Sequence, residues 1–457
     1  MEELRIVVKR NGDKVPYQTK KIYAAIAGAN KDSRGEMSAH AISNAVMQTD
    51  VKLQGKREIS VEHIQDMVEE TLMDNKYFKT AKQFIIYRDL HNKRREANKK
   101  LMASYSDLLF TDAEDMDLKR DNANINTDAP MGIMLKLGTE GAKSWALSYG
   151  LPEKFVKAHK EHAIHYHDLD FSFITLNCLQ QDLGKTLKNG FNTGHGFLRE
   201  PNSIRAAASL ACIAIQSSQN DCFGGQSINA LDYALAPYVE KSFKKALKKV
   251  LLRAEDWLGR DTYHLIPQSI KEDIIDKLIQ GNNIRYGLKG EELEAAAKAI
   301  HAEIFGKKDI EQYQSFREAK KLYHMACQDV EEETKQAMEA MIHNFNSLHS
   351  RAGSQVPFSS INFGMNTTPE GRLVIAKTLD AIDAGLGHGE TPIFPISVFT
   401  LKAGVNYNPG DPNYDLFQRA CEVSAKRLYP NFTNLDAPYN LKYYKPDDYN
   451  SFFACMG

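Results

Sequence analysis

The chain has 457 residues, of which 42% are hydrophobic and 26% charged, and its formal net charge is −1. This length predicts two or three domains with a large core. The near-neutral charge gives no long-range field that would favour nucleic acid or an anionic membrane. No apolar run reaches the roughly 18 residues of a membrane span, and the N-terminus lacks a signal-peptide core, so we expect a cytoplasmic protein.

The six cysteines are widely separated and show no CxxC or CxxH spacing. Scattered thiols suit a reducing compartment better than a disulfide framework. They give no argument for a zinc site. The cysteines are Cys178, Cys212, Cys222, Cys327, Cys421 and Cys455.

The first ninety-odd residues are expected to form a unit of one β-hairpin and several helices. In LRIVVKRNGDKVPY, two short β-rich runs are joined by Asn11-Gly12, which is a strong hairpin signal. Thr19 is predicted to cap a first helix, and Ser38 and Ser60 to cap two more. A fourth helix, YFKTAKQFIIYRDLHNKRREANKK, ends in a charged stretch that predicts a linker after about Arg95.

Basic residues gather around the hairpin and the first helix. Lys9 and Arg10 precede the hairpin turn, while Lys20 and Lys21 occupy the first turn of the helix. Cations at a helix N-terminus oppose the helix dipole, and a bound anion would relieve this opposition. A phosphate site and a solvated charged face explain the placement about equally well.

The segments VVKRNGDKVPYQTKKIYAAI, ISVEHIQDMVEETL and FIIYRDL resemble the ATP-cone, an allosteric nucleotide-binding module found at the start of many ribonucleotide reductases. The resemblance implies that this unit binds ATP or dATP as an effector. Lys20 could serve phosphate but lies outside the motif. The nucleotide-contacting positions of the module are matched by Val8, Lys9, Arg10 and Lys21.

Further along, GLPEKFVKAHKEHAIHYHDLDFSFITLNCLQQD predicts a helix through His162, an extended stretch, and a buried strand, ITLNCL, that carries Cys178. Within it, His165 and His167 would share one face of a strand beside Asp168, and two histidines with a carboxylate can form a facial metal triad. Buried histidines with satisfied hydrogen bonds are commoner than ligands, so we expect no metal there. Cys178, taken alone, is typical of a small buried hydrophobe.

The middle of the chain is predicted to be mostly helical, in VEKSFKKALKKVLLRAEDWLGRD and between Lys289 and His349. The lysines around Lys244 and Lys248 are expected to be a solvated helix face rather than a nucleic-acid site. In CFGGQSIN, the glycine pair could turn the chain or cradle phosphate, but a helix end followed by an N-cap is the favoured interpretation.

Five segments in chain order resemble the core of the anaerobic, class III ribonucleoside-triphosphate reductases, from about Asn122 to the last residue. The resemblance implies an α/β fold, with the cone at 1–95, a linker at 96–120, and an incomplete ten-stranded α/β barrel of the glycyl-radical type at 121–457. The segments are HYHDLDFSFITLNCLQQDL, NSIRAAASLACIAIQSSQNDCFGGQSINALDYALAPYV, SRAGSQVPFSSINFG, ETPIFPISVF and GDPNYDLFQRACEVSAKRLYPNF.

The family chemistry explains why cysteine is needed. The C–H bond at the ribose 3′ position is too weakly acidic for a general base, but a sulfur radical can abstract this hydrogen. A second thiol then supplies hydrogen as the 2′-hydroxyl leaves as water, and the site lies inside a barrel that excludes solvent and oxygen. The resemblance matches Cys178 to this second thiol.

In the family, the loop after KRLYP leads to Met-Gly-Cys-Arg, whose cysteine carries the thiyl radical. This chain stops at Met456-Gly457, one position earlier, and Cys455 does not take that role. The glycyl-radical loop and a four-cysteine zinc site are expected only in a missing C-terminal part. The chain is therefore expected to be an inactive fragment that binds ATP or dATP, with a selenocysteine codon read as a stop as one explanation.

The complete enzyme is expected to reduce ribonucleoside triphosphates to deoxyribonucleoside triphosphates for DNA synthesis, with ATP favouring activity and dATP inhibiting it. The resemblance implies a homodimer and a separate iron–sulfur, S-adenosylmethionine-dependent activating enzyme. The reductant, formate or a dithiol protein, stays open. The alternatives are a non-catalytic ATP/dATP sensor and a pyruvate formate-lyase-like enzyme, although the latter typically has adjacent cysteines and no cone.

Overall fold

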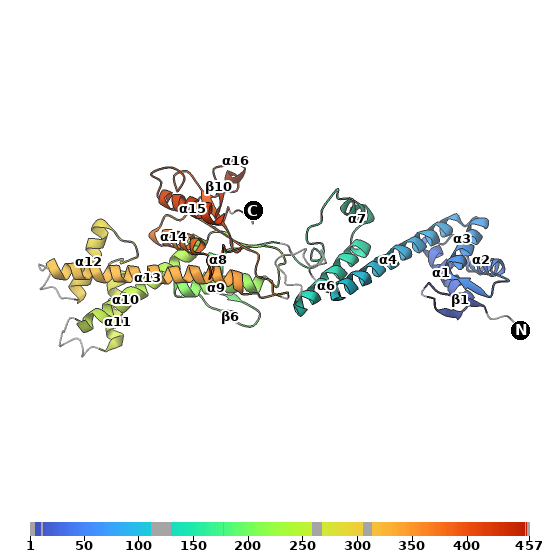
Figure 1. The fold of residues 1–457 in the computed structure, drawn as a ribbon, viewed down its shortest axis with the longest axis horizontal. Coiled ribbons are helices and arrows are strands. Elements are labelled where there is room, and N and C mark those ends of the chain that lie inside the picture. The colour runs from blue at the N-terminus through green and yellow to red at the C-terminus, as the bar shows by residue number, and fades with distance from the viewer. Residues whose placement is uncertain are drawn as a thin grey trace. The chain divides into compact units, whose positions relative to one another are not determined.

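A computed structural model describes residues 5–10, 12–110, 129–176, 178–257, 267–304, 313–351, 353–452 and 454. The chain divides into two compact units, Met1–Thr111 with Glu140–His165, and Asp112–Thr139 with Tyr166–Gly457. Figure 1 shows the helices and strands of both units. None of the helices in the described part of the chain is long and apolar enough to cross a membrane.

The first unit contains a three-stranded sheet packed beside helices. The predicted hairpin is confirmed, because β1 (Ile6–Val8) pairs antiparallel with β2 (Lys14–Pro16), and β1 also pairs in parallel with β3 (Glu58–Ser60). Asn11 lies outside the described residues, while Gly12 has a φ of +89°, which glycine adopts readily. The helices are α1 (Thr19–Asp32), α2 (Ala39–Lys52), α3 (Val61–Asp74) and α4 (Phe78–Phe110).

Two of the three predicted helix caps are confirmed. The Ser38 hydroxyl accepts the N–H of Ala41 at the start of α2, and the Ser60 hydroxyl accepts that of His63 at the start of α3. The prediction for Thr19 is wrong by one position, because Thr19 is the first helical residue of α1. Gln18 occupies the capping position, and no capping bond from its side chain is found among the described residues.

The prediction that the fourth helix ends near Arg95 is wrong, since α4 continues to Phe110. Its charged stretch is rich in Lys, Arg, Glu and Ala, which have good helix propensity and can extend into solvent. Residues 111–128, which include the second part of the linker expected at 96–120, lie outside the described residues. The elements that follow are α6 (Pro130–Trp145), the π-helical turn η2 (Ala146–Gly150) and α7 (Glu153–Lys160).

The second unit is built around a parallel sheet of five strands in the order β10-β9-β8-β7-β4. This sheet, with the helices between its strands, confirms an α/β class. A short hairpin of β5 (Phe191–Asn192) and β6 (Phe197–Leu198) lies outside the sheet. The strands are β4 (Leu179–Gln181), β7 (Gln226–Ile228), β8 (Ser359–Phe363), β9 (Ile396–Leu401) and β10 (Asn431–Asn434).

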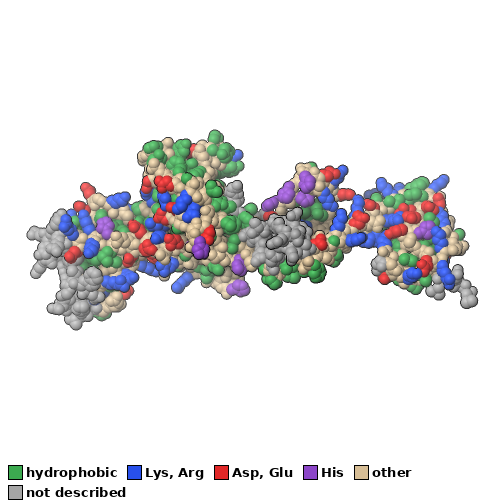
Figure 2. All heavy atoms as spheres, in the orientation of Figure 1, with side chains coloured by type: hydrophobic (Ala, Val, Ile, Leu, Met, Phe, Trp, Pro, Cys, Tyr) green, Lys and Arg blue, Asp and Glu red, His purple; other side chains and the backbone are tan. Residues whose placement is uncertain are grey.

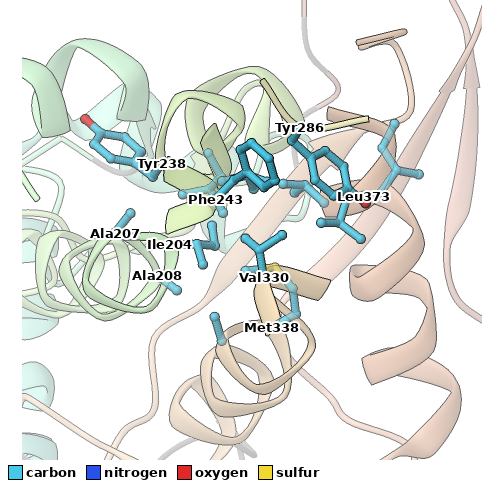
Figure 3. Close-up of a cluster of buried hydrophobic side chains, with 14 of the residues drawn as sticks. Ile204, Ala207, Ala208, Tyr238, Phe243, Tyr286, Val330, Met338 and Leu373 are labelled. Atoms are coloured by element: carbon cyan, nitrogen blue, oxygen red, sulfur yellow. The ribbon is translucent and has the colours of Figure 1, made fainter. Parts of the chain in front are cut away.

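Helices cover one face of this sheet and form the main core. The predicted helical middle of the chain is confirmed where it is described, while its residues 258–261 and 305–312 lie outside the described residues. Figure 3 shows apolar side chains of α9, α10, α13 and α14 interlocking, with Phe243 at the centre. Phe243 and Phe345 are fully buried there. The helices are α8 (Leu183–Asn189), α9 (Ile204–Ser218), α10 (Leu231–Trp257), α11 (Gln268–Gly281), α12 (Gly290–Ile304), α13 (Tyr313–Ser347), α14 (Pro369–Ala384), α15 (Tyr414–Arg427) and α16 (Pro438–Leu441).

Acidic and basic side chains are interspersed over the face of the molecule drawn in Figure 2. On α10, Lys244 bonds Glu240 of the same helix, and Lys248 bonds Glu272 and Asp276 of α11. These lysines are therefore neutralised within the protein, as expected for a solvated helix face.

The segment between α7 and β4 differs from the prediction of an extended stretch and a buried strand. His162 and Asp168 have positive φ angles, and Phe171 and Ile174 close successive turns by donating N–H to Asp168 O and Phe171 O. Local turn bonds therefore replace the strand. In CFGGQSIN the prediction is also wrong, since the glycines lead into β7 rather than into a helix cap.

Candidate functional site

A cavity of about 310 Å³ lies in the first unit, between the hairpin, α1, α3 and α4. Its walls are mainly apolar, and its polar atoms come from a few lysine, glutamine and tyrosine side chains. Such a lining suits a flat apolar group together with a charged one. The lining residues are Val7, Lys9, Val15, Pro16, Tyr17, Gln18, Lys21, Ile22, Ala25, Val61, Ile64, Gln65, Val68 and Phe84.

The structure brings Lys9 and Lys21 together in this cavity. Gln18, which precedes α1, lies in the same lining, so the amino end of the helix faces the cavity. The first turn of α1, which is fully described, contains no acidic residue. The helix dipole and the ammonium groups of Lys9 and Lys21 therefore both favour an anion in this cavity. The arrangement can therefore hold a phosphate group.

The other two predicted effector residues, Val8 and Arg10, are not in the described lining. Val8 neighbours Val7 on β1, and alternation along the strand directs the two side chains to opposite faces. The Arg10 guanidinium instead bonds the Glu62 carboxylate and the Gln65 amide oxygen. The hydrogen bond from Arg10 lowers the pKa of Glu62, and Gln65 connects this ion pair to the cavity.

In the second unit, the sheet face opposite the helices is polar. On β8, Ile361 and Phe363 belong to the helical core, so Ser360 and Asn362 point to the other face. On β7, Ser227 lies beside Ser360 in register, and the Asn362 amide donates to the Ser227 hydroxyl at 3.2 Å. The repeated Ser-Ile-Asn sequences at 227–229 and 360–362 are therefore aligned on neighbouring strands.

Two polar atoms near this face are buried without a hydrogen-bond partner among the described residues: Asn229 Oδ1 and Ser360 Oγ. Asn229 is 7% exposed and Ser360 is fully buried. A buried polar atom costs free energy unless it is satisfied. Both atoms therefore mark places where a polar ligand or a water molecule would bind favourably.

A cavity of about 250 Å³ opens where β7, β8, β9 and β10 end at their carboxyl edge. Ligands of open parallel α/β sheets bind at this edge. Asn229 and Asn362 contribute to the floor, and residues of the C-terminal segment close one side. The lining residues are Asn229, Ala230, Asp232, Tyr233, Asn362, Phe363, Met365, Thr400, Leu435, Tyr444, Pro446, Asp447, Tyr449 and Phe452.

The turn after β8 is held rigidly at this cavity. One carboxylate oxygen of the buried Asp232 accepts the N–H groups of Gly364, Met365 and Asn366 at 2.9–3.0 Å. Burial raises the pKa of Asp232, while these N–H bonds act in the opposite direction. The Asn406 amide bonds Gly364 O, whose residue has a φ of +118° that favours glycine.

The C-terminal segment lies across the polar face. Asn362 of β8 bonds the backbone of Ala454, and the ring of Tyr449 stacks on Tyr233 of α10 with 5.0 Å between the ring centroids. Burial raises the pKa of Tyr233 to about 12. The chain therefore reaches the sheet shortly before residues 455–457, which lie outside the described residues and include Cys455.

Cys178 directly precedes β4 and is exposed, so the expectation of a buried strand position is wrong. Leu179 N–H bonds Gly225 O, which extends the β4–β7 ladder up to this position. Cys178 lies two residues before Gln180, whose register partner is Ser227 of the polar face.

Metal ligands do not converge in the described part of the chain, where no group of three His, Cys, Asp or Glu residues has metal-binding geometry. The HYHDLD segment forms turns, and the His167 ring lies 3.6 Å from the Asp168 carboxylate. The ring centroids of His159 and His165 are 5.9 Å apart.

Comparisons with known proteins agree with the sequence resemblances. A family model described as "Anaerobic ribonucleoside-triphosphate reductase" matches residues 121–457, and one described as "ATP cone domain" matches residues 5–93. The chain belongs to the anaerobic ribonucleoside-triphosphate reductase family.

Relatives of the same name are found in bacteria and a bacteriophage. The reductase of Haemophilus influenzae is 30% identical over 438 residues, which are 94% of this chain and 52% of the relative. That of Escherichia coli is 30% identical over 433 residues, 94% of this chain and 51% of the relative. The phage T4 reductase is 27% identical over 284 residues, 62% of this chain and 36% of the relative. The chain spans about half the length of the bacterial relatives.

For this family member, the sequence indicated Lys9 and Lys21 of the cone cavity but not the uncharged polar residues of either cavity. Gln18 and Gln65 of the cone cavity carry no signal apart from their position beside the matched motif. The polar sheet face did have a signal, since both Ser-Ile-Asn repeats alternate polar and apolar residues as a half-polar strand does.

Proposed function

We propose that this protein carries out the anaerobic radical reduction of ribonucleoside triphosphates to deoxyribonucleoside triphosphates, for DNA synthesis, under control of ATP and dATP. The observation that carries the proposal is the exposed Cys178 thiol at the start of β4, on the sheet whose polar face also binds Ala454 through Asn362. A thiol in that position is accessible to a ribose on the polar face.

Cys178 is the proposed catalytic residue. Its role is to give a hydrogen atom to the substrate while the 2′-hydroxyl leaves as water, after another sulfur has taken the 3′ hydrogen. The unsatisfied oxygens of Asn229 and Ser360 would accept hydrogen bonds from substrate hydroxyl groups. The described side chains that β7 and β8 direct to this face, Ser227, Ser360 and Asn362, are uncharged, which avoids competing proton transfer around a radical.

We further propose that the five-stranded sheet forms one half of a ten-stranded α/β barrel within a domain at 121–457. The edge strands β4 and β10 each have one neighbour among the described strands. A second half-barrel would pair these edges and cover the polar face, which removes the exposed strand edges that proteins avoid. The glycyl radical and a structural zinc are assigned to the part of the relatives that this chain does not span.

The unit at 1–95 is proposed to bind ATP or dATP as an effector. Lys9 and Lys21 would hold the phosphates at the amino end of α1, with Val8 and Arg10 at the margin of the site. The apolar wall of Ile22, Val68 and Phe84 suits the base. A homodimer and a separate iron–sulfur, S-adenosylmethionine-dependent activating enzyme complete the proposal.

The test is an anaerobic assay on the protein as the cell produces it, after activation by such an enzyme, with each ribonucleoside triphosphate in turn. Deoxyribonucleotide should form with the wild type and with Cys421→Ala, an exposed cysteine on α15, but not with Cys178→Ala. Product formation by Cys178→Ala at the wild-type rate would remove Cys178 from the mechanism. Absence of product from the activated wild type with all four substrates contradicts the reductase proposal.

A further inference from the structure

The Arg10 side chain is held beside the cone cavity rather than in it. Its Nε and Nη2 atoms bond the two carboxylate oxygens of Glu62 on α3, and Nη2 also donates to Gln65 Oε1 at 3.0 Å. Gln65 lines the cavity, and so does Lys9, the residue before Arg10. The guanidinium is therefore one hydrogen bond away from the cavity, and a carboxylate occupies the face that it would offer to a phosphate.

The pair of Arg10 and Glu62 has the geometry that a guanidinium group uses for phosphate. Two parallel N–H bonds from one arginine fit the oxygens of a carboxylate and those of a phosphate. The side chains of Arg10 and Glu62 are 30% and 46% exposed, and a pair so accessible to water contributes little to stability. The phosphates of a bound nucleotide can therefore replace Glu62 at little cost.

A second arginine is available to Glu62 when Arg10 leaves. Nη2 of Arg88 on α4 lies 3.9 Å from Glu62 Oε2. Nη1 of Arg88 bonds Asp66 at 2.6 Å and Glu69 at 2.9 Å. The three carboxylates are spaced i, i+4 and i+7 along α3, so they lie on one face of that helix. Glu62 thus stands between an arginine beside the cavity and an arginine of α4.

The helix that carries Arg88 extends past the cone core. Beyond Arg88, Lys93 of α4 bonds Glu153 of α7 at 3.2 Å. On the same turn, the Arg94 guanidinium lies 4.3 Å from the centre of the Tyr149 ring in η2. A change in the partners of Arg88 therefore takes place on the element that connects the cone cavity to α7.

We propose that Glu62 forms an autoinhibitory contact of the effector site, holding Arg10 outside the cavity until the phosphates of a bound nucleotide withdraw it. The freed carboxylate then pairs with Arg88 of α4. Because Glu62 competes with the nucleotide for Arg10, the apparent affinity is lower than that of a protein whose Arg10 is free. This inference rests on the proposed effector function of the unit at 1–95, and it adds a residue that opposes nucleotide binding and links it to α4.

The first experiment is a double-mutant cycle on ATP binding, measured by isothermal titration on the full chain. Glu62→Gln should bind ATP about two- to fivefold more tightly than the wild type, because Arg10 then has no carboxylate partner. Arg10→Ala should bind more weakly, and adding Glu62→Gln to it should change the affinity no further. The control is Glu58→Gln, which removes a similarly exposed carboxylate from its pair with Lys14 and should bind like the wild type.

An unchanged or lower affinity of Glu62→Gln would overturn the proposal. An equal gain in Glu58→Gln, or in the Arg10→Ala background, would overturn it as well, since the gain would then come from the loss of negative charge and not from Arg10. No ATP binding by the wild type would overturn the effector function and this contact with it. Normal binding by the wild type with no effect of Glu62→Gln overturns the contact alone.

The second experiment follows the Glu62 carboxyl group by carbon NMR, with its signal assigned by Glu62→Gln. In the free protein, the hydrogen bond from Arg10 lowers the pKa of Glu62. Saturating ATP should raise this pKa in the wild type and leave it unchanged in Arg10→Ala, where no guanidinium is withdrawn. An ATP-independent pKa in the wild type, or an equal rise in Arg10→Ala, overturns the withdrawal of Arg10.

The same titration tests the new partner of Glu62. With ATP bound, the pKa of Glu62 should be higher in Arg88→Gln than in the wild type, because the variant lacks the cation that receives the freed carboxylate. Equal values in the two ATP-bound proteins would overturn the pairing of Glu62 with Arg88.

Discussion

The side-chain amide of Asn362 on β8 forms hydrogen bonds with both the N–H and the carbonyl oxygen of Ala454. The Asn362 amide donates to Ala454 O at 3.1 Å, and Ala454 N–H donates to Asn362 Oδ1 at 2.8 Å. The Asn362 side chain thus bonds both backbone groups of one residue, as a neighbouring strand would, and it holds the C-terminal segment on the polar face of the sheet.

Asn362→Ala should release this segment without unfolding the sheet. The two hydrogen bonds to Ala454 are lost along with the one to Ser227. Each bond to Ala454 is worth about 0.5–1.5 kcal/mol, so local opening around Ala454 should become roughly tenfold more frequent. Hydrogen exchange of the peptide that contains residues 449–454 measures this change. Asn202→Ala, which removes an exposed asparagine, is the control. Equal exchange in the wild type and Asn362→Ala would show that other contacts hold the segment.

Lys9→Ala combined with Lys21→Ala should weaken ATP and dATP binding at the cone cavity. Each lysine provides a charge-assisted contact to phosphate, so the double variant should lose about 10- to 100-fold in affinity. Isothermal titration of both nucleotides measures the loss. Lys20→Ala is the matched control, since Lys20 has the same charge on the same helix turn but is not in the described lining. An equal loss in the control would indicate nonspecific attraction rather than a site.

Tyr323→Phe should destabilise the helical core of the second unit. The Tyr323 hydroxyl accepts Leu288 N–H at 2.8 Å and donates to Arg285 O at 2.9 Å, and Tyr323 is 1% exposed. Phenylalanine keeps the packing but leaves both backbone groups unsatisfied, at a cost of about 1–3 kcal/mol. Urea unfolding followed by circular dichroism measures the shift, with the exposed Tyr439→Phe as control. Identical midpoints would mean that water replaces the hydroxyl.

Local chemistry explains which elements were predictable from the sequence. Ser38 and Ser60 cap their helices and Gly12 ends its hairpin turn, because each depends on residues a few positions away. Cys178 was misplaced because Ile174 and Leu176, which suggested a buried strand, are 74% and 78% exposed. Whether these two side chains are buried depends on distant parts of the fold, which cannot be inferred from the local pattern of polar and apolar residues.

In the candidate sites too, features that depend on residues close in the sequence were predictable, and features that depend on distant residues were not. The sequence could associate Lys9 with Lys21 because both belong to one motif, and both line one cavity. Asn229 and Asn362 lie at the ends of strands that are far apart in the sequence. Their approach depends on the pairing of β7 with β8. Only the repeated Ser-Ile-Asn sequence could have indicated that these strands are neighbours.

Asp383→Asn should destabilise the packing of α15 on α14 in a pH-dependent way. Bonds from Lys426 and Arg419 lower the pKa of Asp383 below its usual range. The contribution of this carboxylate is therefore present above about pH 4, the unfolded pKa, and is lost as pH falls through the lower folded pKa.

At pH 7 the difference between Asp383→Asn and wild type should be about 1 kcal/mol, since the ion pairs are partly exposed, and it should shrink below pH 4. Urea midpoints measured between pH 7 and pH 3.5 test this dependence. Asp329→Asn, which removes an exposed carboxylate on α13, is the control. A difference that stays constant with pH would assign the effect to packing rather than charge.

The alternation along β8 makes this strand unusually sensitive to changes in chain length. Inserting or deleting one residue between Ser360 and Asn362 would reverse the direction of every later side chain in the strand. Phe363 would then leave the helical core, and the asparagine that holds Ala454 would be forced into it. We therefore expect substitutions to accumulate in β8 during evolution of this protein far more readily than single-residue insertions or deletions.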